Sequence, residues 1–246
     1  MLDKPGAMKW WTRLDPTKGN LAKTTGILGL LFTAELAVHF GGHFVETFYM
    51  GRLGPEFISA VTLSIMVLTF GMSFFLELGT GMTTLVSQLI GANKGPDAAR
   101  VIGQAILLSV GGTLPIAVAG AFLAPQFLEL MGAEPSVIQV GTPYLRLGSG
   151  ALLLIIMPFL LNAALRAVGN AALATGMEVF QLSLLFILTP IFVLGFGSIP
   201  RLETLGAMLA LVITRLIATI IQLSYFVSGR LVVHLDQASI RTHLPT

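Results

Sequence analysis

Four ionisable residues recur on one helical face near the start of the chain: Glu35, His39, His43 and Glu46. At about 100° per residue they fall within an arc of about 80° on a single helix. The run around them, residues 26–49, is otherwise almost wholly apolar or small and is long enough to cross a bilayer. A charge at membrane depth costs at least ~2.5 kcal/mol, so such side chains usually face a water-filled cavity or a partner. The stripe predicts an ion or proton pathway inside a membrane protein.

The composition independently indicates a membrane protein. Hydrophobic residues make up 54% of the 246 residues and charged residues only 11%, whereas a soluble domain carries about 25% charged residues. Cysteine is absent, which excludes disulfides and thiolate metal sites. The net charge of +2 is spread along the chain, so nucleic acid is not an expected partner. No cofactor is expected either.

Hydropathy and turn residues predict an all-α fold with six membrane spans. A cytoplasmic or interfacial segment, residues 1–24, precedes the six-helix region 25–228, and a polar cytoplasmic tail, 229–246, follows it. The predicted spans are 25–50, 57–90, 99–123, 137–165, 173–197 and 203–228.

The distribution of basic residues predicts the orientation of the spans. With the N-terminus inside the cell, ten Lys and Arg residues fall in cytoplasmic segments and two, Arg52 and Arg201, on the opposite side. Because Lys and Arg are enriched in cytoplasmic loops, we expect both termini to be cytoplasmic.

Short motifs between and within the spans resemble those of the N-terminal half of a multidrug and toxic compound extrusion (MATE) transporter, over about residues 25–228. The motifs are Phe44 to Gly54, Gly79 to Ala92, Tyr144-Leu-Arg146, Leu165 to Gly169, and Thr189-Pro190. The resemblance implies a multi-pass protein of the inner (cell) membrane that exports organic cations or drugs in exchange for H⁺ or Na⁺. It also implies two six-helix lobes and about twice this length. The chain is therefore expected to be one lobe, paired as a homodimer or with a separately encoded second half.

The resemblance places Glu46 where the family's first-span carboxylate takes part in cation coupling. A carboxyl at low dielectric is costly to ionise, which agrees with loading and release of a proton. The alternative is an interfacial glutamate paired with Arg52 or hydrated. His39 and His43 either line a cavity with structural hydrogen bonds, relay protons beside Glu46, or form an i,i+4 metal pair. Glu35 is expected only to line a cavity or to supply a third metal ligand.

Further polar residues are candidates for the lining of the same cavity. Glu77, inside the second span, either contacts a substrate cation or forms a hydrogen bond to Ser73 or a neighbouring helix. Glu178, Gln181 and Thr189 lie on one side of the fifth span and would continue a polar lining, although Glu178 alternatively lies at the cytoplasmic interface.

The fifth span departs from the family pattern. Where the family often has Asn-x-x-x-Asp-Pro, this chain has Leu185, Thr189 and Pro190. Any proton site must then be rebuilt around Glu46 and the histidines, with or without Glu77, or coupling has weakened. Pro190 removes a backbone hydrogen bond within the helix and is predicted to act as a hinge.

Four other polar residues are expected to have structural roles. Arg146 matches the family motif and is predicted to fix one end of the fourth span through carbonyl groups or Glu134. Arg215 needs an acidic or carbonyl partner at membrane depth. Asn162 and Gln222 are typical of interhelical hydrogen bonds.

The sequence therefore predicts a secondary antiporter, or half of one, with a site centred on Glu46. One alternative is a non-transporting truncated or assembly subunit, which the residues Leu185 and Thr189 favour. A second is a divalent-metal carrier that uses His39 and His43. Motifs of zinc proteases and serine hydrolases are absent, so an intramembrane enzyme is not expected.

Overall fold

The computed structural model describes residues 21–196 and 200–227, with side chains in the first helix described at positions 26, 29, 30 and 33 and from 40 onward. The described chain is almost entirely helical. Residues 1–20 and the predicted tail, 229–246, lie outside it. The helices are α1 (Leu21–Gly51), α2 (Pro55–Gly91), α3 (Gly95–Leu130), α4 (Pro135–Gly150), α5 (Leu152–Ala167), α6 (Ala171–Leu194) and α7 (Glu203–Val227).

Glycine and proline set where several of these helices begin. Proline occupies the first turn of α2, α3 and α4, where its fixed φ suits a helix and its missing N–H costs nothing. The turn before α2 contains Gly54 with φ 147°, a backbone conformation that a side chain rarely permits. These short turns return each helix alongside the preceding one.

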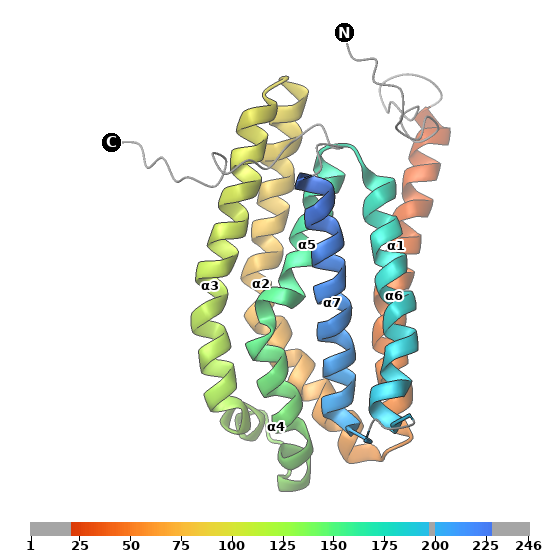
Figure 1. The fold of residues 1–246 in the computed structure, drawn as a ribbon, viewed down its shortest axis with the longest axis vertical. Helices are drawn as coiled ribbons and strands as arrows, with labels where there is room; N and C mark the ends of the chain where they lie inside the picture. Colours follow the sequence, from red (N-terminus) through yellow and green to blue (C-terminus); the bar gives the residue numbers. More distant parts are fainter. Residues whose placement is uncertain (1–20, 197–199, 228–246) are drawn as a thin grey trace.

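The helices form one elongated bundle in which the chain runs alternately up and down (Figure 1). Helix α1 begins at the same end of the bundle at which α7 finishes. Helices α2, α3, α6 and α7 are each long and apolar enough to cross a membrane, and α4 and α5 pass this test together as a bent pair. This confirms a helical, multi-span membrane fold. Six crossings, which would require α1 as a further span, and the cytoplasmic termini stay predictions.

The fourth predicted span, 137–165, is two helices joined at Ala151 with a bend of 53°. The helix weakens there because Gly148, Ser149 and Gly150 are poor helix formers. The break sends α5 into the centre of the bundle (Figure 1).

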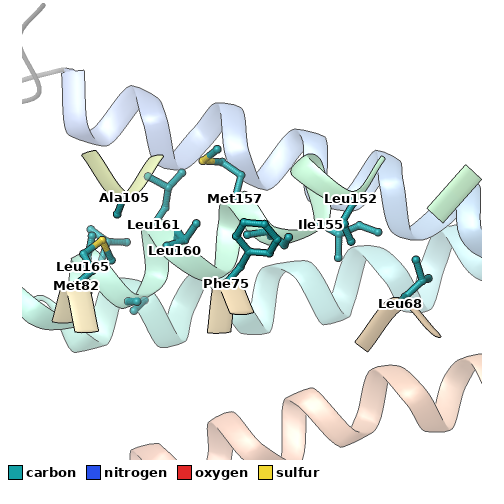
Figure 2. Packing of buried hydrophobic residues seen from close by; sticks show 14 of the residues in the cluster. Leu68, Phe75, Met82, Ala105, Leu152, Ile155, Met157, Leu160, Leu161 and Leu165 are labelled. Carbon is teal, nitrogen blue, oxygen red and sulfur yellow. The ribbon is translucent and has the colours of Figure 1, made fainter. Parts of the chain in front are cut away.

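Helix α5 is the centre of the apolar core. It is buried on nearly all sides, as expected for a helix that is apolar all round, and it packs against α2, α3, α6 and α7. Figure 2 shows Phe75 of α2 beside Leu160 and Ile155 of α5, with Met82 and Leu165 further along the same contact. The core therefore fixes α2 and α5 against each other.

Two contacts between helices require glycine. A Cβ at Gly120 of α3 would come within 2.2 Å of Ser149 Oγ in α4, and a Cβ at Gly206 of α7 would come within 2.3 Å of the Phe192 carbonyl oxygen in α6. Small residues of this kind let membrane helices approach closely. The α3–α4 and α6–α7 contacts thus hold the two sides of the bundle around α5.

Candidate functional site in the interhelical cavity

A cavity of about 420 Å³ opens between α1, α2 and the helices α4 to α7. Apolar side chains from α2, α5 and α6 form much of its wall, including Leu68, Met72, Phe159 and Leu182. Its polar lining comes mainly from α1, α4, α6 and α7: His43, Glu46, Thr69, Tyr144, Glu178, Gln181, Thr189, Thr214 and Arg215. Two acidic residues and one arginine thus share a mostly apolar chamber.

Glu46 of α1 is held by a residue far away in the sequence. The Tyr144 hydroxyl, in α4, donates a hydrogen bond of 2.6 Å to Glu46 Oε1. Tyr144 is almost completely buried, with 1% of its surface exposed. The Arg52 guanidinium, the alternative partner, lies over the Phe48 ring, 4.7 Å from its centroid, and an ion pair between Arg52 and Glu46 is not among the contacts of the described residues. Among the described residues, Glu46 is therefore an interior carboxyl with one neutral donor.

Glu178 of α6 belongs to a second polar cluster, formed with α5 and α7. Asn162 Nδ2 donates to Glu178 Oε1 at 2.6 Å, and Gln222 Nε2 donates to Asn162 Oδ1 at 2.6 Å. Asn162 and Gln222 are fully buried. The prediction that these two amides join helices is confirmed. Glu178 also lines the cavity, and its depth relative to the membrane interface stays a prediction.

Arg215 of α7 completes this second cluster. Its Nη1 donates to Gln181 Oε1, and the charge of Glu178 acts on it through space. The prediction that Arg215 needs a carbonyl or acidic partner is thus met by a side-chain carbonyl with an acid nearby. In the described part of the chain, Arg215 Nε is nevertheless buried without an acceptor.

The cavity brings together five of the predicted site residues. Glu46, His43, Glu178, Gln181 and Thr189 all line it. The Thr189 hydroxyl donates at 2.7 Å to the Leu185 carbonyl of its own helix, as threonines within helices often do. The side chains of Glu35 and His39 lie outside the described residues, so their roles stay predictions. Among the described residues no group of three metal-ligating side chains gathers.

Three other predicted site residues do not line the cavity. Glu77 is exposed on α2 and does not line the cavity, although its neighbour Leu76 does. Arg146 is an exposed side chain of α4, and a bond between it and Glu134 is not among the contacts of the described residues. Pro190 lies inside α6, which continues to Leu194. Its predicted role as a hinge stays a prediction.

Sequence reasoning missed several polar residues of the cavity, among them Tyr144 and Thr214. Tyr144 belonged to a recognised motif, but only the fold shows that its hydroxyl meets Glu46. Thr214, beside Arg215, carries no sequence signal beyond its neighbour. For both residues, the one cue available in the sequence was a hydroxyl group within an apolar span.

Helices long and apolar enough to cross a membrane, arranged around a mostly apolar cavity with a few charged side chains, are typical of multi-pass membrane transport proteins. The chain belongs to the MatE family, whose family model matches residues 33–191. It is 25% identical over 178 residues to an FAD transporter of Shewanella oneidensis, with 72% of this chain and 39% of that protein covered. It is 26% identical over 190 residues to the probable multidrug resistance protein YoeA of Bacillus subtilis, with 77% and 41% covered.

The fold resembles that of solved transporters of this family. An outward-facing multidrug resistance MATE transporter superposes with a TM-score of 0.83 at 21% identity, covering 96% of this chain and 51% of the other. The chain thus spans about half the length of the relatives it matches, or somewhat less. The matched proteins are named as transporters and multidrug resistance proteins, so the family is one of transporters and not of enzymes.

Proposed function

We propose that this chain forms one six-helix lobe of an antiporter that exports organic cations from the cell across the inner membrane in exchange for H⁺ or Na⁺. The observation that carries the proposal is the cavity, where Glu46 and Glu178 face a space large enough for a small organic molecule. Carboxylates in an apolar chamber attract organic cations and coupling ions alike. Both chain termini lie in the cytoplasm in this arrangement.

Glu46 is the coupling residue in this proposal, with His43 and His39 as its neighbours on α1. Among the residues that the structure describes, its carboxyl accepts a hydrogen bond from one neutral donor, Tyr144. A proton, a sodium ion or a cationic substrate would each neutralise it, so these ligands compete for one group. Such competition is the elementary requirement of exchange transport. The relatives are named for FAD transport and for multidrug resistance, so names within the family cover more than one substrate.

A second lobe is needed to enclose a pathway between halves. We assign that role to a second copy of this chain or to a separate six-helix half. Native mass measurement in detergent and in lipid distinguishes these cases, because a protein that is monomeric in both contradicts the homodimer.

Dye efflux tests the proposal. Cells or inverted vesicles that contain the wild-type protein should move a cationic dye when a pH or sodium gradient is imposed. Glu46→Gln should reduce gradient-driven efflux at least about tenfold, since the amide cannot exchange a proton. Glu129→Gln is the matched control, because it makes the same chemical change at an exposed site at the end of α3. Equal efflux by wild type and Glu46→Gln would remove Glu46 from the mechanism.

A non-transporting membrane subunit is the second candidate. The apolar Leu185 in the cavity wall favours it, because the family pattern often has an amide there. Efflux no greater than that of cells without the protein would support this alternative.

A further inference from the structure

Arg215 lies in the middle of α7 and lines the cavity with only part of its hydrogen-bonding capacity used. A guanidinium carries five N–H donors in a planar fork. Gln181 accepts a bond from Nη1, while Nε is buried and has no acceptor among residues 21–196 and 200–227. An arginine at membrane depth is costly and normally has all its donors engaged. Within the described chain, Nε of Arg215 therefore lacks a partner.

Thr214, the preceding residue, shows the same deficit. It lines the same cavity, only 1% of its surface is exposed, and its hydroxyl has no partner within the described chain. Threonines elsewhere in the helices behave differently: Thr189 and Thr219 each donate to a carbonyl one turn earlier. Two adjacent residues of α7 thus bring unpaired donors to the cavity wall.

Unpaired donors next to a positive charge suit an oxyanion. Carboxylate and phosphate groups bind the edges of a guanidinium through two parallel hydrogen bonds. The acids in the same chamber oppose a purely anionic ligand, since Glu178 and Glu46 also line it. A molecule that carries both charges meets both requirements, with its oxyanion at Arg215 and its cationic group towards the carboxylates.

We infer that the cavity binds zwitterionic organic substrates, whose carboxylate or phosphate is held by Arg215 and Thr214 while the cationic group faces Glu46. The inference rests on the proposed export function and narrows its substrates. A volume of about 420 Å³ accommodates a drug-sized molecule with both groups.

The test uses two dyes that differ in one group. A rhodamine with a free benzoate carries both charges, and its methyl ester is purely cationic. Binding of each dye to the purified full chain is measured by fluorescence anisotropy in an alkyl maltoside detergent and phosphate-free buffer. Wild type should bind the carboxylate dye about tenfold more tightly than the ester, the size expected for a charged hydrogen-bonded pair. Equal affinities, or tighter binding of the ester, would overturn the inference.

Variants show which residues cause the preference for the carboxylate dye. Arg215→Gln should abolish the preference for the carboxylate dye and change the affinity for the ester less than about threefold. Arg215→Lys should retain part of it, because the charge stays but the fork is lost. Thr214→Val should weaken only the carboxylate dye. Arg100→Gln is the control, since that arginine is exposed on α3 and paired with Asp97. If Arg215→Gln fails to fold, Thr214→Val and the wild-type dye comparison still decide the matter.

A lipid headgroup also carries an oxyanion, and a further measurement separates it from a substrate. Anionic phospholipid is added to the detergent sample, and the two dyes are titrated again. A preference that survives supports a substrate site, whereas a preference abolished by the lipid assigns Arg215 to a headgroup and overturns the inference. If neither dye binds under any condition, the proposed export function itself fails. Tight binding of the ester alone leaves that function intact and removes only the zwitterion.

Discussion

The two polar clusters of the cavity differ in how their charges are held. The first cluster is a pair, Glu46 of α1 and Tyr144 of α4, joined by one hydrogen bond. The other cluster spans α5, α6 and α7 and contains three hydrogen bonds: from Asn162 to Glu178, from Gln222 to Asn162, and from Arg215 to Gln181. The pair therefore joins two helices through one bond, whereas the larger cluster joins three helices. Coupling chemistry suits the first, and substrate positioning with stability suits the second.

Substitution in the larger cluster should have the greatest effect on stability. Asn162→Leu leaves Glu178 Oε1 without its donor and Gln222 Nε2 without its acceptor. The expected loss in the free energy of unfolding is roughly 2 kcal/mol, because two buried polar groups lose their partners. Unfolding by denaturant in mixed micelles measures it. Gln104→Leu, at an exposed amide on α3, is the control. Equal stability of the two variants would show that the cluster does not hold the helices together.

Loss of the hydrogen bond between Tyr144 and Glu46 should lower the free energy of unfolding by less than the Asn162 substitution does. Tyr144→Phe removes one hydrogen bond, so we expect a loss of about 1 kcal/mol in the free energy of unfolding. Efflux should fall, but less than in Glu46→Gln, since the carboxyl remains. Tyr49→Phe on the same helix as Glu46 serves as the control, measured in the same unfolding and dye assays. A larger stability loss from Tyr144→Phe than from Asn162→Leu would reverse the comparison between the clusters.

Glu77 lies outside both clusters, and its substitution should have the smallest effect. Because its side chain is exposed on α2, Glu77→Gln should change the free energy of unfolding by less than about 0.5 kcal/mol. Dye efflux should stay at the wild-type level. Efflux reduced as far as in Glu46→Gln would return Glu77 to the transport site, where sequence reasoning had placed it as one possibility.

Much of the helical fold could be predicted because long apolar runs and turn residues are local signals. The bounds of α2, α6 and α7 agree with the expected spans to within a few residues. The bend at Ala151 was not foreseen, since small residues are frequent in membrane helices and rarely mark a break by themselves. Nor does an apolar sequence show that α5, and not α3, becomes the central helix. That outcome depends on packing among all the helices.

The sequence predicted residues of the candidate site only where an ionisable group within a membrane span is costly enough in free energy to indicate a function. Glu46, Glu178 and Arg215 stand out because ionisable groups within a span need a compensating environment. Their partners do not stand out: Tyr144 is 98 residues from Glu46 along the chain and meets it only because the fold brings the two side chains together. The exposure of Glu77 likewise depends on which face of α2 meets its neighbours. Contacts of this kind are properties of the assembled bundle.

The break at Ala151 places the two residues of the fourth span that donate hydrogen bonds to the cavity acids on different helices. Tyr144, which holds Glu46, lies before the break, and Asn162, which holds Glu178, lies after it. A change in the angle between α4 and α5 would move Tyr144, the donor to Glu46, while Asn162, the donor to Glu178, stays packed in the core. If Glu46 exchanges an ion as proposed, this joint would let its surroundings change while the polar cluster of α5, α6 and α7 stays in place.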